Sequence, residues 1–171
     1  MVEYWISGTL NGKTMLDKML LRKGVSDYSI EKTANGKPYL SGNPMHFNIS
    51  HSNGMTAVCV SDCEVGIDIQ EIKQINPKIA QRFFTENEYE YFLQHGPEGF
   101  FTIWTRKESL LKYLGSTLAD GISKYDVFSQ NIYFFERQIK NCRLCICTQE
   151  QTEVVDISDI MSDLCKSEKR D

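Results

Sequence analysis

The chain has 171 residues, a formal net charge of −4 and a pI near 5.4, with 41 % hydrophobic and 25 % charged residues. This balance is typical of globular proteins and excludes widespread disorder. Because nucleic-acid binding requires a basic surface, the acidic charge argues against nucleic acid as the main partner. The apolar runs are far shorter than the ~20 residues of a membrane-spanning helix. Residues 1–5 also lack the basic and apolar regions of a signal peptide, so we expect a cytoplasmic protein with no membrane partner.

The first predicted element is a helix over residues 13–23. Its apolar side chains recur at helical spacing, at Met15, Leu16, Met19 and Leu20. Gly24 suits its C-terminal end. A turn is predicted over residues 35–38, where Asn, Gly and Pro cluster.

Three strands are predicted next, over residues 45–49, 55–61 and 65–70. A loop over residues 50–54 joins the first two, and its Asn-Gly pair is a strong hairpin signal. Asp62-Cys63-Glu64 forms the second turn. These segments predict a three-stranded meander.

The middle of the chain is predicted to be helical. Asn76-Pro77 is a favourable helix start, with Asn as N-cap and Pro at the first helical position. Thr85 and Glu88 have the spacing of a capping box at a second start. His95-Gly96-Pro97 is expected to end that helix. The longest helical pattern follows over residues 100–114.

The last part of the chain is predicted to form strands over residues 127–128, 133–140 and 143–148, followed by a frayed tail at 166–171. The runs 56–60 and 143–147 are similar and hint at an internal duplication. An order of helix, strands, helices and strands is consistent with an α+β protein.

The six cysteines raise the question of zinc or disulfides. Cys142, Cys145 and Cys147 lie in a run that alternates like a strand, and Cys59 lies in another strand-like run. No second Cys or His pair appears at similar spacing, as a zinc site would normally have. The pattern therefore favours buried cysteines acting as small hydrophobic residues.

Asp68 is the first candidate for chemistry. It lies between Ile67 and Ile69 in a predicted strand, where a carboxylate must be compensated or must face a cleft. Its side chain is either a metal ligand or an exposed Asp on the solvent face of the meander.

Glu108 and Lys112 are the second candidates. Glu before Lys at a spacing of four on a helix is the favourable order for a surface ion pair. Trp104, one turn earlier on the same face, suggests instead that this face is partly covered. Two carboxylates and a lysine from separate elements would suit Mg²⁺ and a phosphoryl group. Taken alone, Glu88 is explained by the capping box, and His51 and Lys37 by adjacent turns.

Five segments carry a family resemblance: residues 36–40 (GKPYL), 47–52 (FNISHS), 66–69 (GIDI), 82–89 (RFFTENEY) and 104–112 (WTRKESLLK). In this order and spacing they resemble the successive motifs of the 4′-phosphopantetheinyl transferases of the surfactin-synthetase type. The resemblance covers roughly residues 36 to 128. Lys13-Thr14 and the following helix extend it more loosely.

The resemblance implies an enzyme that moves the 4′-phosphopantetheine group of coenzyme A to a serine of an apo acyl or peptidyl carrier protein, releasing 3′,5′-ADP. It also implies an α+β fold of two pseudo-symmetric halves, each with a small antiparallel sheet and a packed helix. The halves would be residues 1–70 and 71–171, with the active site in the cleft between them. We expect the enzyme to act as a monomer.

The resemblance also implies roles for individual residues. Asp68 and Glu108, with Gln70, would hold Mg²⁺ against the coenzyme A pyrophosphate. Lys112 would contact the pyrophosphate and stabilise the departing 3′,5′-ADP. Glu108, with Glu88 through a water molecule, would be the base for the carrier serine.

The nucleotide end of coenzyme A would be held by a second group of residues. Ser50 and His51 would contact its phosphates, and Lys37 would lie beside the adenosine. Lys13 and Thr14 would help to bind the 3′-phosphate.

The chain departs from the family pattern twice. Gln70 stands where relatives often have Glu, which removes a negative charge from the metal site and predicts weaker Mg²⁺ binding. Only about a dozen residues precede Lys13, so coenzyme A affinity is expected to be lower. Two alternatives stay open: an inactive binding module for coenzyme A or a carrier protein, and another Mg²⁺-dependent nucleotide hydrolase. The hydrolase lacks support from a phosphate-binding glycine loop.

Overall fold

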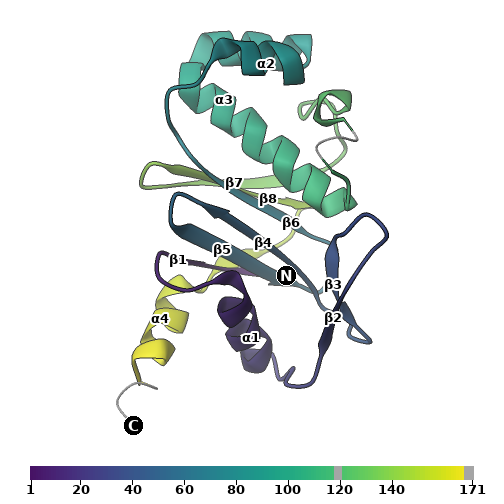
Figure 1. Cartoon of the computed structure of the whole chain (residues 1–171), viewed down its shortest axis with the longest axis vertical. Helices are drawn as coiled ribbons and strands as arrows, with labels where there is room; N and C mark the ends of the chain where they lie inside the picture. The colour runs from purple at the N-terminus through teal and green to yellow at the C-terminus, as the bar shows by residue number, and fades with distance from the viewer. Residues whose placement is uncertain (118–120, 168–171) are drawn as a thin grey trace.

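The computed structural model describes residues 1–117 and 121–167 (Figure 1). Its helices and strands follow one another as β1 (Val2–Ser7), α1 (Gly12–Arg22), β2 (Ser29–Lys32), β3 (Pro38–Ser41), β4 (His46–Ser52), β5 (Met55–Ser61), β6 (Gly66–Glu71), α2 (Pro77–Phe83), α3 (Glu86–Leu114), η2 (Ile122–Lys124), β7 (Tyr133–Ile139), β8 (Cys142–Thr148), β9 (Val154–Asp156) and α4 (Ser158–Ser167).

The strands of this part of the chain form two larger sheets and one hairpin. The first sheet has the order β4-β5-β1-β9, in which β9 runs parallel to β1 and the other neighbours are antiparallel. The second sheet is antiparallel, with the order β6-β8-β7. Strands β2 and β3 form a separate antiparallel pair.

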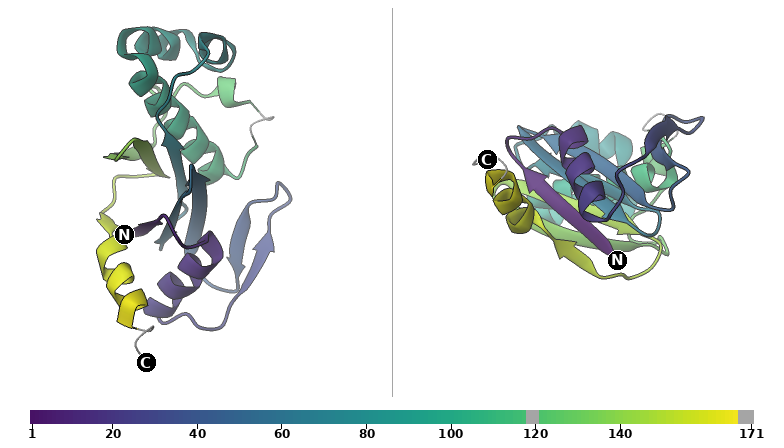
Figure 2. Two further views of the ribbon diagram at one scale, coloured as in Figure 1. Left: turned by 60° about the vertical axis from the view of Figure 1, so that its left-hand side comes forward. Right: turned by 90° about the horizontal axis from the view of Figure 1, so that it is seen from below.

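The elements are stacked so that helices cover the outer faces of the two sheets. Apolar side chains of α1 and α4 pack on one face of the first sheet around Trp5, and Figure 2 shows both helices at the end of the molecule opposite α2. A second core, including Tyr4 and Ile67, lies between the sheets. A third core joins α2, α3 and Phe134 of β7.

Several local predictions are confirmed. Helix α1 begins after Asn11, whose side chain accepts a hydrogen bond from the Thr14 N–H. The capping box of Thr85 and Glu88 is present. The predicted break near residue 96 is a kink within α3, where Gly96 adopts a φ of 59°. Asn53 and Gly54 form the hairpin turn, both with positive φ.

The predicted meander is wrong. Strand β6 does not pair with β5, because β1 occupies the free edge of β5, and β6 pairs with β8 instead. The predicted loop over 50–54 is also largely strand, since β4 continues to Ser52. Residues 127–128 lie in a turn rather than a strand.

The α+β class is confirmed. The two pseudo-symmetric halves and the boundary at residue 70 stay predictions. Strand β9 joins the sheet of the N-terminal strands, so the end of the chain returns to the first sheet. Residues 168–171 of the predicted frayed tail lie outside the described residues, whereas Lys166 belongs to α4. No helix in the described ranges is long and apolar enough to cross a membrane.

Candidate active site

Asp68 lies at the centre of a buried polar cluster. Asp68 lies near the middle of β6, and only 1 % of the residue is exposed. Its Oδ1 accepts hydrogen bonds from Ser50 Oγ at 2.7 Å and from Lys112 Nζ at 2.8 Å. Its Oδ2 accepts one from Gln70 Nε2 at 3.1 Å. The alternative of an exposed Asp on a solvent face is therefore wrong, because this carboxylate is buried and compensated by hydrogen bonds.

Lys112 reaches Asp68 from α3. Its Nζ also donates to the Ile67 carbonyl at 3.0 Å, so it is held at two points of β6. The sequence alternative of a surface pair with Glu108 does not describe this geometry, because the ion pair of Lys112 is with Asp68. Lys112 thus connects the helix to the strand and places a positive charge beside the buried carboxylate.

Gly66 explains how α3 can lie so close to β6. A Cβ built on Gly66 would stand 2.0 Å from the Ser109 carbonyl oxygen and 2.6 Å from the Tyr113 amide nitrogen. Any side chain at this position would push the helix away from the strand. The glycine therefore sets the approach that brings Glu108 and Lys112 to Asp68.

Glu108 is the second carboxylate of the cluster. Its pKa is raised to about 7, mainly by burial and in part by the nearby negative charge of Asp68, while Lys112 opposes the shift. A single ammonium group thus faces two carboxylates. A second cation would neutralise the negative charge that remains. The donor set of two carboxylates and an amide consists of the hard oxygen ligands that Mg²⁺ prefers. The residues present therefore fit a magnesium ion, although Gln70 now directs its amide nitrogen toward Asp68.

A pocket of about 260 Å³ adjoins this cluster and is lined by residues that include Gly36, Lys37, Asn48 and Lys112. Lys37 is held in this lining by its Nζ, which donates to the Tyr113 carbonyl at 2.8 Å and pairs with Glu64 at 2.5 Å. Two lysines that the sequence assigned to coenzyme A thus line one pocket, beside the two carboxylates assigned to the metal.

The other predicted nucleotide contacts lie elsewhere. Lys13 pairs with Asp17 at 2.5 Å and, with Tyr28, lines a different pocket. Thr14 is in the first turn of α1. His51 is exposed near the end of β4. These placements leave the predicted roles of Lys13, Thr14 and His51 as predictions.

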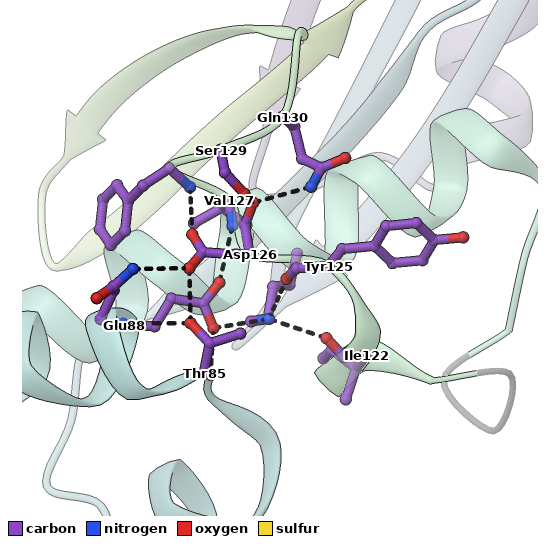
Figure 3. A network of polar contacts seen from close by, with 11 residues as sticks. Thr85, Glu88, Ile122, Tyr125, Asp126, Val127, Ser129 and Gln130 are labelled. Carbon is purple, nitrogen blue, oxygen red and sulfur yellow. Dashed lines mark hydrogen bonds and ion pairs between the residues drawn. The ribbon is translucent and has the colours of Figure 1, made fainter.

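Glu88 belongs to a separate buried network, drawn in Figure 3. Its Oε1 accepts a hydrogen bond from the Val127 N–H, and its Oε2 accepts one from the Thr85 N–H, each at 2.8 Å. Lys107 pairs with Oε2 at 2.8 Å, with side-chain exposures of 1 % and 0 %. Both carboxylate oxygens thus have partners in this network, and the role of Glu88 as a base stays a prediction.

Lys107 is a buried residue that the sequence motifs did not single out. It donates to the carbonyls of Ile122 and Tyr125 at 2.9 and 2.5 Å, and so holds the segment after α3 against the helix. Burial lowers its pKa, and the pairing with Glu88 opposes that shift. The available signal was its place in the polar run of residues 105–109, next to Glu108, within an otherwise largely apolar helix.

Comparisons with known proteins show the family of the chain. The family model described as the 4′-phosphopantetheinyl transferase superfamily matches residues 64–158, more than half of the chain. The match begins just before β6 and includes Asp68, Glu108 and Lys112.

Curated relatives of the chain have names of the same kind. The 4′-phosphopantetheinyl transferase psf-1 of Bacillus pumilus is 36 % identical over 126 residues, covering 66 % of this chain and 54 % of that protein. Sfp of Bacillus subtilis strain 168 is 34 % identical over 129 residues, covering 67 % and 57 %. AcpT of Salmonella typhi is 32 % identical over 121 residues, covering 66 % and 63 %. The chain thus spans little more than half the length of these relatives. On the family match, the chain belongs to the 4′-phosphopantetheinyl transferase superfamily.

Proposed function

We propose that this protein transfers the 4′-phosphopantetheine arm of coenzyme A to a serine of an apo acyl or peptidyl carrier protein. The observation that carries the proposal is the buried Asp68, which Lys112 and Glu108 approach from α3 beside a pocket lined by Lys37. The curated relatives, which are named 4′-phosphopantetheinyl transferases, support it.

In the proposed reaction, the carrier serine oxygen attacks the phosphorus that bears the pantetheine arm. The bond from this phosphorus to the oxygen of the leaving 3′,5′-ADP breaks, and the serine proton passes to a base. Such a transfer depends on an in-line nucleophile and on neutralising the charge that grows on the leaving group. Lys112 suits that second task, because its positively charged side chain lines the pocket and is 29 % exposed.

Asp68 and Glu108 would hold Mg²⁺, with Gln70 contributing its amide oxygen after rotation of the side chain. When bound there, the ion supplies charge neutralisation at the pyrophosphate. Glu108, whose pKa is about 7 before a cation is added, is the proposed base for the serine hydroxyl, with Glu88 as a second predicted participant. His51, Lys37, Lys13 and Thr14 would contact the nucleotide end of coenzyme A. The cleft between residues 1–70 and 71–171 is the proposed binding site.

Intact-mass spectrometry tests the proposal directly. An apo carrier protein incubated with this protein, coenzyme A and Mg²⁺ should gain the mass of one phosphopantetheine arm. Asp68→Ala and Glu108→Ala should abolish the gain, whereas Asp163→Ala, an exposed carboxylate of α4, should leave it unchanged. No gain with several unrelated carriers would contradict the transferase proposal.

A second candidate is a binding module for coenzyme A or a carrier protein, without catalysis. The specific observation in its favour is the neutral Gln70 beside Asp68. Gln70→Glu separates the two: in an attenuated enzyme the transfer rate should rise, whereas in a binding module the reaction stays absent while coenzyme A is still bound.

A further inference from the structure

Where the two sheets meet, the first sheet contributes side chains and the second contributes backbone N–H groups. Strand β4 is the edge of the first sheet and β6 is the edge of the second. The Ile67, Ile69 and Glu71 N–H groups are directed away from β8, since alternate residues of an antiparallel strand face opposite neighbours. Such buried donors need acceptors.

Alternate side chains of β4 provide those acceptors. Asn48 Oδ1 accepts from the Ile67 N–H at 3.1 Å. Ser50 Oγ accepts from the Ile69 N–H at 3.3 Å. Ser52 Oγ accepts from the Glu71 N–H at 3.1 Å. The resulting ladder joins the sheets through side-chain oxygens where a sheet would normally use backbone carbonyls.

Ser50 differs from the other two members of this ladder. Its hydroxyl accepts one hydrogen bond from β6 and also donates its own proton to Asp68 Oδ1 at 2.7 Å. The residue is buried, with 4 % of its surface exposed. A hydroxyl has a single proton to donate, so in this arrangement none is left for a phosphate oxygen.

We propose that Ser50 is a positioning residue that fixes the carboxylate of Asp68 for cation binding, and does not contact the coenzyme A phosphates through its hydroxyl. The Ile69 N–H sets the position of Ser50 Oγ, and Ser50 Oγ sets that of Asp68 Oδ1. The second oxygen, Oδ2, is then presented toward the half-buried Gln70. The inference rests on the proposed function, since it concerns the cation expected at Asp68.

The proposed role of Ser50 is that of a residue that orients a metal ligand through a hydrogen bond. Groups that hydrogen-bond a ligating carboxylate hold it in the orientation that the metal requires, and losing one typically weakens metal binding by about 10–100-fold. Removing the Ser50 hydroxyl would leave Asp68 with Lys112 as the partner of Oδ1. The carboxylate would then turn toward Lys112, and its fit to a metal would be lost.

Ser52 provides a matched control. It has the same residue type, lies two positions further along the same strand and makes the same kind of bond to β6, but its hydroxyl bonds the Glu71 N–H alone among the described contacts. Ser52→Ala therefore reports on loss of one rung of the ladder. Ser50→Ala reports on that loss together with the loss of the bond to Asp68.

The test is calorimetric titration of MnCl₂ into the protein with coenzyme A present, together with titration of coenzyme A in EDTA. Ser50→Ala should weaken Mn²⁺ binding by about tenfold or more, and Ser52→Ala by less than about twofold. Ser50→Thr, which keeps the hydroxyl, should restore most of the affinity. Affinity for coenzyme A in EDTA should be unchanged. A variant that loses affinity for coenzyme A in EDTA while keeping that for Mn²⁺ would overturn the inference in favour of a phosphate contact.

Two further measurements keep the result decisive. If Ser50→Ala does not fold, Ser50→Cys serves instead, because a thiol is a weak donor of similar shape, and it should also weaken Mn²⁺ binding. If the unmodified protein binds no Mn²⁺ and transfers nothing, the proposed function fails. A crystal structure of Ser50→Ala then decides the inference alone: a rotated Asp68 carboxylate supports it, and an unmoved one refutes it.

Discussion

Gly66 lies directly against Ser109, with room for no side chain between them: an added Cβ would stand 2.0 Å from the Ser109 carbonyl oxygen. The obstructing atoms belong to the backbone of α3 and cannot rotate aside as a side chain can. The closeness of strand and helix at this point is what allows a lysine on α3 to reach an aspartate on β6.

Gly66→Ala should therefore separate α3 from β6. Overpacking of a well-packed interior typically costs about 1–3 kcal/mol, and a contact with backbone places this variant at the upper end. We expect a lower midpoint of denaturant unfolding and loss of phosphopantetheine transfer. Gly8→Ala is the control, because the added Cβ would stand 3.6 Å from Met55 Sδ, which is an ordinary van der Waals contact. Equal stability of Gly66→Ala and the parent protein would show that the helix can shift freely.

Lys112→Met should leave Asp68 without its ammonium partner. Removing one member of a fully buried pair costs about 3–5 kcal/mol. A cost of about 1–3 kcal/mol is expected here, because the Lys112 side chain is 29 % exposed. Transfer should be lost, while Lys112→Arg should retain more stability than Lys112→Met. Unfolding in urea, followed by circular dichroism, measures both variants. A Met variant as stable as the parent would mean that Ser50 and Gln70 compensate Asp68 by themselves.

Glu108 should make the stability of the metal-free protein depend on pH. Folding raises its pKa from 4.5 to about 7, so between these values the native state holds a proton that the unfolded state has lost. Stability from this group is therefore greatest at low pH and falls as the pH rises through that window. Glu108→Gln should remove the fall and raise the melting temperature at about pH 8 more than at about pH 5.

The measurement for this prediction is thermal unfolding in EDTA. Added Mg²⁺ should stabilise the parent protein at the higher pH and should have little effect on Glu108→Gln, because the ion binds the native state through that carboxylate. Parallel pH profiles for the two proteins would contradict the assignment of the shifted pKa to Glu108.

The effects of Glu88 and Lys107 on the free energy of unfolding should depend on each other, because the two buried charges form an ion pair. Lys107→Met should cost about 3–5 kcal/mol, since it leaves a buried carboxylate unpaired. The double variant Glu88→Gln, Lys107→Met should be more stable than the sum of the single losses predicts, by a margin that a double-mutant cycle measures. Strict additivity would show that the two charges do not interact energetically.

Much of the helical part of the fold could be predicted from the sequence, because its signals are local. Asn76 and Thr85 cap helices with their own side chains, and Gly96 marks the kink in α3 through its backbone conformation. The pairing of strands could not be predicted in the same way. β6 resembles the third strand of a meander, yet its partner β8 lies more than 70 residues away. Only the positions of β1 and β8 in space decide that pairing.

The candidate site was predicted as a set of residue types but not as a set of contacts. The motifs singled out Asp68, Glu108 and Lys112, and the structure places Lys112 against Asp68. They gave no indication that Ser50 bonds Asp68 or that Lys107 is buried against Glu88. A serine or lysine in a sequence looks the same whether its side chain faces solvent or a carboxylate. That difference depends on tertiary packing.

The pairing of β9 with β1 has a consequence for the way the chain is made. β1 comprises Val2–Ser7, and its parallel neighbour is Val154–Asp156. On the ribosome, one side of β1 stays unpaired until residues 154–156 have been synthesised. Contacts of such long sequence separation slow folding and prolong the exposure of an unpaired strand edge. The bond from Arg137 to the Tyr4 hydroxyl also joins β1 to a segment that is made much later, so β1 is synthesised long before all of its partners exist.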